Sequence, residues 1–543
     1  MRFNKIIFIL LIIQTFLWAN KNTVVTGDVS YYYMQRLKDQ SLVNIPFRML
    51  NLNVIHQNNN FDVNGTFALE YRNRKDTDFM ESSDPSDVNP VLRELYLTYF
   101  LENGEISLGK KIYTWGSVDE NSPIDILNAH DNYYLLIGTS ERKLGSYSIS
   151  FDYYLNNGTM KISGIYAPMH NATRYPINDD EYEFGLPTTI NKNQIIEIED
   201  PAEMGFSIQQ SFNRGEITLS HYRAYDRVPS LSGFNMYQRI YLNEGDENNP
   251  DDDIWVTDGT DTDVPNVDTI LNYDLTETTN IGSVFLFNDF TIRFDYALFK
   301  SQDEADMEDY LNRECSSIGL ASLGGVCDYT FSFDSSTEKF IVSSDDVNSG
   351  IDQENFVYLG GEQLSFPIKE KAEYTQQTFQ IELPLADDYQ INMQYFKYEF
   401  KRKNYYYDDP LIDEYGNPSE LDLTNVPLPD FCDPNDVLTC LLPYGEYNPG
   451  MGAPFAILSS ETMFISLEKM LLDNDLKLTL STLMDLDKGF GELASFEADY
   501  NMGNGLNALI GLTKVIGDDE VENYAFNDME DFSNLRFELK YNF

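Results

Sequence analysis

The sequence predicts an all-β protein: a transmembrane, antiparallel, up-and-down β-barrel of about 18 strands, with about 16 as the alternative count. Three observations lead to this prediction. Apolar and polar residues alternate in many runs of about ten residues, the length that a tilted membrane strand requires. Short turns rich in Asn, Asp and Gly alternate with long acidic connections. The last ten residues, NLRFELKYNF, alternate to the end.

The period-two pattern is clear in FDVNGTFALEYRNR (61–74) and YQINMQYFKYEFK (389–401), where one face is mainly apolar or aromatic and the other mainly polar. The same pattern predicts the remaining strands. They are expected at 23–35, 46–57, 92–101, 106–115, 146–155, 159–166, 203–212, 216–225, 277–287, 290–300, 373–383, 457–470, 476–485, 492–501, 506–516 and 533–543.

The connections predict how the strands are joined. Hairpin turns are expected at sites such as NNN (58–60), ENGE (102–105) and GNG (503–505), and most other connections are long. An even strand count would place both chain ends on the periplasmic side, and the last strand would close the barrel against the first. A secreted β-sandwich or β-helix is the soluble alternative, but neither requires so many strands of about ten residues.

The first residues, MRFNKIIFILLIIQTFLWAN, predict export. A basic start, an apolar run and the small Ala19 are typical of a signal peptide at 1–19, followed by a single barrel domain at 20–543. A membrane anchor is the alternative, but the apolar run is short and polar residues interrupt it. We therefore expect the protein in the bacterial cell outer membrane.

The net charge of −52 excludes a nucleic-acid partner, because such a chain repels the phosphate backbone. Much of the negative charge lies in segments without Lys or Arg, at 243–268 and 404–455. We expect these segments to form long acidic extracellular loops. Outer-membrane lipid, lipopolysaccharide and the barrel assembly machinery are the expected partners, since a terminal aromatic strand resembles the signal that this machinery reads.

The loops contain two further candidate features. Four cysteines form two local pairs, Cys315 with Cys327 and Cys432 with Cys440, which predicts two disulfides in an oxidising compartment, with free thiols as the alternative. The oxygen-rich stretch with Asp258, Asp261 and Asp263 is a weak calcium candidate, because hard cations prefer oxygen ligands. The spacing does not match an EF-hand, so we favour a solvated loop with loosely bound divalent cations at most, and we expect no cofactor.

The stretch LGKKIYTWGSVDENSPIDILNAHD (108–131) breaks the strand pattern. Ser122 and Pro123 predict a helix start or a turn. We expect a segment near 116–145 to fold inward and constrict the pore, or to act as a structural latch. The candidate residues of the lumen and constriction are Lys110, Lys111, Trp115, Asp119, Asp125, Asn128, Asp131, Arg72, Arg93 and Arg223.

The same stretch resembles a family. Gly109-Lys110-Lys111, Trp115-Gly116, Asp119, Ser122-Pro123, Asp125 and Leu127-Asn128 resemble the GKQ–WG–D–SP–D–LNPRD signature of the barrel family of domain of unknown function 1302, which is loosely similar to alginate-export porins. The likeness covers about residues 90–230. The chain departs from the signature at Lys111, Ala129 and His130. The resemblance implies an outer-membrane channel, in some members acting beside an inner-membrane exporter, and it brings no catalytic residues.

These observations predict an outer-membrane, porin-like channel for passive or exporter-linked passage of small solutes or secreted compounds. A surface receptor or adhesin that acts through its loops is one alternative, and a conduit for lipids or hydrophobic compounds is another. We do not expect an enzyme, because the four histidines form no recognisable catalytic or metal-binding arrangement.

Overall fold

The structure, a computed structural model, describes residues 22–43, 45–72, 87–135, 137, 142–175, 194–243, 254–257, 266–305, 309–310, 330–334, 339–343, 356–367, 369–386, 388–406, 449–521 and 524–543. The predicted signal peptide, the four cysteines and the three calcium candidates lie outside these residues. In the part that is described, no helix has both the length and the hydropathy needed to cross a bilayer.

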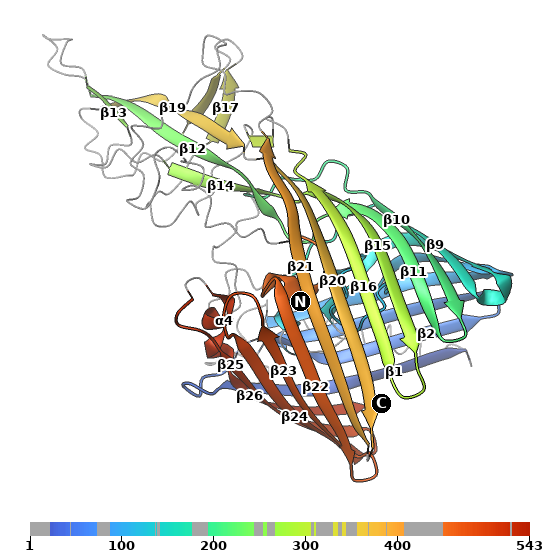
Figure 1. The fold of residues 1–543 in the computed structure, drawn as a ribbon. Coiled ribbons are helices and arrows are strands. Elements are labelled where there is room, and N and C mark those ends of the chain that lie inside the picture. The colour runs from blue at the N-terminus through green and yellow to red at the C-terminus, as the bar shows by residue number, and fades with distance from the viewer. Residues whose placement is uncertain are drawn as a thin grey trace, which may run out of the picture.

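Eighteen antiparallel strands form one closed sheet, which confirms the predicted fold class (Figure 1). The strands are β1 (Thr23–Arg36), β2 (Pro46–Asn58), β3 (Phe61–Arg72), β4 (Val88–Leu101), β5 (Gly104–Lys111), β8 (Ser146–Leu155), β9 (Met160–Ala167), β10 (Glu203–Phe212), β11 (Gly215–Tyr225), β15 (Leu275–Leu286), β16 (Thr291–Gln302), β20 (Lys369–Leu385), β21 (Tyr389–Tyr406), β22 (Glu461–Leu471), β23 (Leu476–Asp485), β24 (Glu492–Gly503), β25 (Leu506–Ile516) and β26 (Asn534–Asn542).

The first and last strands close the barrel. β1 and β26 pair antiparallel from Asp28 opposite Asn542 to Arg36 opposite Asn534. The backbones of Gly27 and Phe543 exchange two further hydrogen bonds, of 3.0 and 2.9 Å. A Cβ on Gly27 would lie 2.4 Å from the carbonyl oxygen of Asn51, so the seam requires glycine there. Closure leaves this sheet without free edges.

Strand alternation gives the barrel two different faces. Along β26, Leu535, Phe537 and Leu539 are exposed on the outside, whereas Arg536 points inward. The other strands follow the same rule, with Leu108 and Leu480 more than half exposed on the outer face. An apolar exterior and a polar interior are the pattern of a barrel that spans a membrane.

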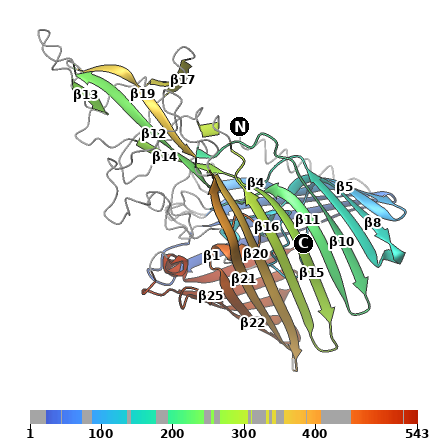
Figure 2. The ribbon, with the colours of Figure 1, turned by 45° about the horizontal axis from the view of Figure 1, so that its top comes forward.

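A second sheet lies outside the barrel. It contains β12 (Ser230–Asn243), β13 (Ile254–Thr257), β14 (Asn266–Asn272) and β19 (Phe356–Pro367), and both ribbon views show it projecting away from one end of the barrel (Figures 1 and 2). The hairpin of β17 (Thr330–Asp334) and β18 (Lys339–Ser343) belongs to the same connections. These regions were predicted to be loops, because strands outside a membrane need no regular apolar alternation.

The remaining elements are short. They are β6 (Ala129–His130), β7 (Lys143–Leu144), the helix α4 (Ala525–Asp528), and 3-10 turns at Asn132–Tyr134, Asn156–Gly158, Pro454–Ile457 and Glu530–Phe532. Several predicted strand ends differ from the structure by four or five residues: β4 starts at Val88 rather than 92, β20 starts at Lys369 rather than 373, and β21 ends at Tyr406 rather than 401. Two further ends were wrong for a reason that the contacts show. β5 ends at Lys111 rather than 115, because the next amide, that of Ile112, donates to the Glu94 side chain. β22 starts at Glu461 rather than 457, because a 3-10 turn that begins with Pro454 precedes it.

Candidate functional site

Between β5 and β8 the structure describes residues 112–135, 137 and 142–145, and these residues lie inside the barrel; we call them the lumenal segment. It contacts strands far around the wall. The amide of Asp119 donates to Gln380 of β20 at 2.9 Å, and the Tyr134 hydroxyl donates to the carbonyl oxygen of Pro46 in β2 at 2.8 Å. Arg536 of β26 donates to the carbonyl oxygen of Ile137 at 3.4 Å. The segment therefore crosses the lumen.

One buried carboxylate holds the tip of the lumenal segment. Asp295 of β16 accepts hydrogen bonds from the amides of Ser117 and Val118, at 2.8 and 2.9 Å, and from the hydroxyl of Ser122 at 2.6 Å. A Cβ on the neighbouring Gly282 would lie 2.7 Å from the Ser117 hydroxyl oxygen, so a small residue is needed for this close approach. Three donors converging on one carboxylate fix the backbone of the tip in place.

A second anchor involves a buried arginine. Arg227, just after β11, binds the carboxylate of Glu203 with two parallel hydrogen bonds of 2.8 Å. The same guanidinium donates to the carbonyl oxygen of Ile126 in the lumenal segment at 3.2 Å. Tyr222 donates to Glu203 at 2.7 Å, and His170 lies 3.0 Å from it. This fork geometry satisfies a buried ion pair and links the segment to β10 and β11.

A third anchor lies near β2 and β3. Arg174 donates to Glu70 at 2.9 Å and to Asp131 at 3.1 Å, and Arg48 lies 4.0 Å from both acids. The Arg48 guanidinium also lies 4.4 Å from the ring centre of Tyr134. Burial raises the pKa of Asp131, while Arg174 acts in the opposite direction. Two acids and two arginines thus connect the lumenal segment to the wall at β2 and β3.

Apolar packing fills the lumen around these anchors. Ile124, Ile126 and Leu127 are almost fully buried against the wall of the barrel. Their buried neighbours include Ile165, Tyr222, Ala224, Ala297, Phe299, Ala372 and Tyr374. Further along the segment, Tyr133 and Tyr134 pack with residues of β1, β2 and β3, and Leu135 packs with residues of β23 and β25. This part of the lumen is packed like a protein core.

A second segment, residues 449–460 before β22, joins this packing. Gln376 of β20 donates to the carbonyl oxygen of Met451 at 3.2 Å and accepts from the amide of Ala453 at 2.7 Å. The amide of Phe455 donates to the side chain of Asn121 at 3.0 Å. The two segments therefore contact each other inside the barrel.

The structure brings five of the predicted site residues together in the lumenal segment. Trp115 packs edge-to-face with Tyr222, and Asn128 exchanges two hydrogen bonds with the backbone of Tyr113. Asp125 forms an ion pair with Lys143, and burial raises its pKa in spite of this partner. Asp131 belongs to the third anchor. Asp119 is about half exposed and lies 3.8 Å from Arg293. Ser122 and Pro123 start a turn rather than a helix.

The remaining predicted residues are divided between the two faces of the wall. Lys111 points inward and donates to Ser107 on the same face at 3.1 Å. Arg72 lies 5.7 Å from the ring centre of Tyr133, and Arg93 is the extra residue of a bulge between β3 and β4. A pore constriction formed by these residues stays a prediction.

Lys110 and Arg223 were wrong as lumen candidates. Lys110 is paired with Leu95 and Tyr147 and shares their outward face. Arg223 is flanked by Tyr222 and Ala224, which are buried inside, and it is paired with the exposed Met204. A shift of one residue along a strand moves a side chain from one face of the wall to the other. At these strand ends, the sequence pattern did not show which residues face the lumen.

The partners of the lumenal segment and of residues 449–460 were not predicted from the sequence. They are Asp295, Gln376, Gln380 and Glu203 on wall strands, and Arg227 and Arg174 in connections between strands. Alternation along 290–300 puts Asp295 on the polar face, but no local signal tells which polar residue meets a distant segment. Across the described ranges, no group of three or more His, Cys, Asp or Glu side chains could hold a metal ion.

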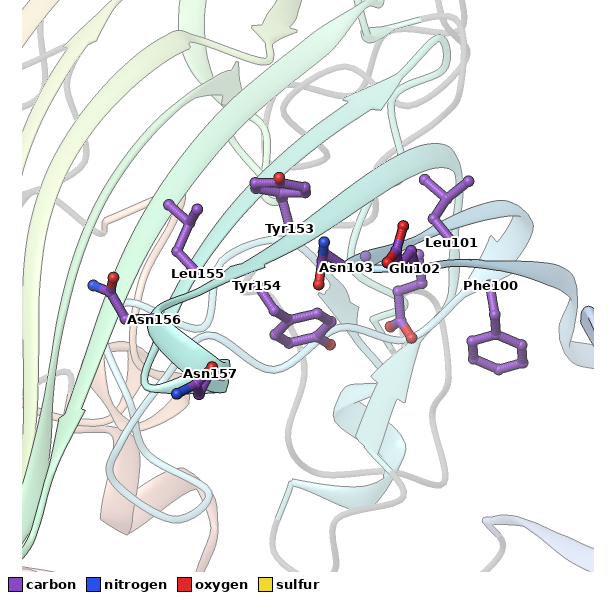
Figure 3. Close-up of a pocket in the computed structure, with 12 residues that line it drawn as sticks. Phe100, Leu101, Glu102, Asn103, Tyr153, Tyr154, Leu155, Asn156 and Asn157 are labelled. Carbon is purple, nitrogen blue, oxygen red and sulfur yellow. The ribbon is translucent and has the colours of Figure 1, made fainter.

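Toward the short turns, the lumen is open to solvent. Phe100 and Tyr154 point inward by strand register, yet they are 40% and 37% exposed. They line a pocket of about 540 Å³ between the turns β4–β5 and β8–β9 (Figure 3). We call the space between the lumenal segment and these turns the vestibule. In the lumenal segment, Asp119 and Glu120 are both about half exposed, and Asp119 lies 3.8 Å from Arg293 of the wall.

A closed barrel with an apolar outer face satisfies every requirement of a lipid-spanning sheet. The protein is an outer-membrane β-barrel. This confirms the predicted localisation.

The chain is similar over nearly its whole length to several solved structures of outer-membrane proteins, at low sequence identity and low TM-scores. The crystal structure of opdK, an outer membrane protein from Pseudomonas aeruginosa, is similar over 97% of this chain and 100% of that chain, at 9% identity and a TM-score of 0.42. OccAB2 of Acinetobacter baumannii is similar over 96% and 98%, at 8% identity and a TM-score of 0.41. The outer membrane channel DcaP of Acinetobacter baumannii is similar over 96% and 97%, at 10% identity and a TM-score of 0.35.

No family model and no curated protein matches the chain. The resemblance to the family of domain of unknown function 1302 therefore stays an expectation. The fold itself rests on the strand pairings described above.

Proposed function

We propose that the protein is an outer-membrane channel for small hydrophilic solutes, and that the lumenal segment narrows its pore. The observation that carries this proposal is the closed barrel with a polar inner face and an exposed vestibule below an inward-folded segment. At about 18 strands a barrel encloses a water-filled lumen unless chain segments fill it. Because two segments fold inward here, we expect a small unitary conductance.

The test is single-channel recording of the refolded protein in a planar bilayer. Steady, small conductance steps from a heat-modifiable, folded barrel would support the proposal. A folded barrel that passes no current, and through which liposomes take up no small sugars, would overturn it.

A receptor or adhesin is the second candidate, and the projecting sheet of β12, β13, β14 and β19 favours it (Figure 1). In that function the outer sheet would bind the ligand or surface, and the barrel would only anchor the sheet in the membrane. Shortening the sheet would leave conductance unchanged under the channel proposal. The polar inner face speaks against the third candidate, a lipid conduit.

The finer expectations rest on the same proposal. The proposal covers two modes, passive passage and passage linked to an inner-membrane exporter, and co-purification of an exporter after crosslinking would distinguish them. Lipopolysaccharide, divalent cations at the acidic loops and the barrel assembly machinery are the proposed partners, supported by the acidic sequence and by the terminal strand with exposed Tyr541 and Phe543.

A further inference from the structure

The strand register sorts the charged residues into two sets, one facing the membrane and one facing the vestibule. Two basic residues that the sequence placed near the lumen, Lys110 and Arg223, belong to the outer set. They therefore add no positive charge to the pore lining, and the net charge of the inward-facing residues does not include them.

Most inward-facing basic residues of the vestibule wall are neutralised by carboxylates on the same face. The pairs lie on β1, β16, β20, β22, β23, β24 and β26, and three of them are close enough for charge-assisted hydrogen bonds. They are Arg293 with Glu382 at 2.7 Å, Lys477 with Glu468 at 2.8 Å, Arg536 with Glu497 at 2.6 Å, and Lys540 with Asp28 at 3.8 Å.

Carboxylates remain on this face after the pairs are formed. Glu105 and Asp152 lie directly opposite each other on β5 and β8, an arrangement of like charges that costs stability. Glu216 accepts from the Ser211 hydroxyl at 2.9 Å, and Asp499 is opposite the already paired Lys477. Within the described strands, none of these four carboxylates forms an ion pair.

Two inward lysines oppose this excess. Lys111 lies near the rings of Tyr96 and Tyr113, and Lys161 is opposite Gln209 on β10. Both act electrostatically on Glu105. With Lys111 and Lys161 set against the four unpaired carboxylates, the vestibule keeps a net negative charge.

We propose that the channel passes cations in preference to anions, and that Glu105, Asp152, Glu216 and Asp499 set this preference. The inference rests on the proposed channel function and names its substrate class, small cationic solutes. Carboxylates inside a lumen with low-dielectric walls concentrate cations and repel anions. Charges on the wall act over about 10 Å at 0.1 M salt, a distance comparable with a narrowed pore.

The experiment is the reversal potential in a potassium chloride gradient across a planar bilayer. For the wild type we expect a potassium-to-chloride permeability ratio several-fold above one, decreasing in molar salt because the Debye length falls to about 3 Å. The combined variant E105Q/D152N/E216Q/D499N should lower the ratio several-fold. The opposite variant K111Q/K161Q should raise it.

The matched control is Glu277→Gln, which removes a carboxylate from the exposed outer side of β15 and should leave the ratio unchanged. A wild-type preference for chloride, or equal ratios in all variants, would overturn the inference and leave the channel function standing. A folded protein without any current would overturn the channel function, and this inference with it. The lysine variant keeps the test decisive if the combined carboxylate variant does not fold.

Discussion

Replacing Asp295 by alanine should release the tip of the lumenal segment. The substitution removes the acceptor of three hydrogen bonds, from the amides of Ser117 and Val118 and from the Ser122 hydroxyl. A hydrogen bond to a charged group contributes about 1.5–3 kcal/mol, and such contributions are not additive on one acceptor. We therefore expect a loss of about 3–5 kcal/mol in the free energy that holds the tip in place.

This loss has a direct readout in amide hydrogen exchange. At about 1.4 kcal/mol per factor of ten, the amides of Ser117 and Val118 should exchange about a hundredfold to several thousandfold faster. Mean conductance should rise if the released tip uncovers the pore. Asp295→Asn keeps the shape and one acceptor oxygen, so we expect an intermediate effect.

Asp152→Ala is the matched control, because it removes an inward carboxylate that accepts a hydrogen bond from Ser163 of β9 rather than from Ser117, Val118 or Ser122. It should leave exchange at residues 117 and 118 unchanged. Wild-type exchange rates in a folded Asp295→Ala barrel would refute the reasoning, since the tip would then be held by its apolar contacts alone.

Three further predictions concern the barrel wall and the inner contacts. Leu480→Arg places a charge on the lipid-facing side of β23 and should cost about 2–4 kcal/mol in urea unfolding from liposomes, whereas Ser481→Arg on the inner face should cost much less. Arg227→Ala leaves Glu203 buried without its guanidinium partner and should lower the free energy of unfolding by about 3–5 kcal/mol, measured as a lower thermal transition temperature. If Arg227→Lys kept the wild-type transition temperature, the two parallel hydrogen bonds of the guanidinium would be shown to be unimportant. Burial, with Arg142, Lys143 and Arg227 nearby, lowers the pKa of His130 to about 3, below the ordinary 6.5. The stability from this group is complete above pH 6.5 and is lost as the pH falls toward 3, at up to about 1.4 kcal/mol per pH unit, so His130→Gln should flatten the unfolding free energy over that window.

The sequence predicted the barrel because each spanning strand has to satisfy lipid on one side and water on the other, and period-two alternation records that requirement locally. It did not predict the outer sheet, where β12 and β19 pair away from the membrane and need no such alternation. The strand ends predicted at 115 and 457 were wrong because the chain turns inward there and side chains replace the strand ladder.

The inner site was predicted in part. Trp115, Asp125 and Asn128 stood out because they interrupt a strand pattern, but their partners on the wall did not. From the sequence, Asp295 is one of many polar residues on the inner face of a strand. Only the pairing of all eighteen strands places it beside Ser117. Adjacent residues such as Lys110 and Lys111 face opposite sides of the barrel wall. At a strand end, the local sequence does not show which of the two faces inward.

The long reach of the lumenal segment has a consequence for the order in which the molecule folds. The segment follows β5, yet its partners on β16, β20 and β26 lie 178, 261 and 399 residues away along the chain. Contacts of such high separation form slowly, since a large loop must close before any of them contributes. We therefore expect the segment to reach its final position late, after the C-terminal strands are in place. Wall assembly and packing of the interior would then be separate kinetic steps, and an intermediate between them would be a closed barrel with an unfilled lumen.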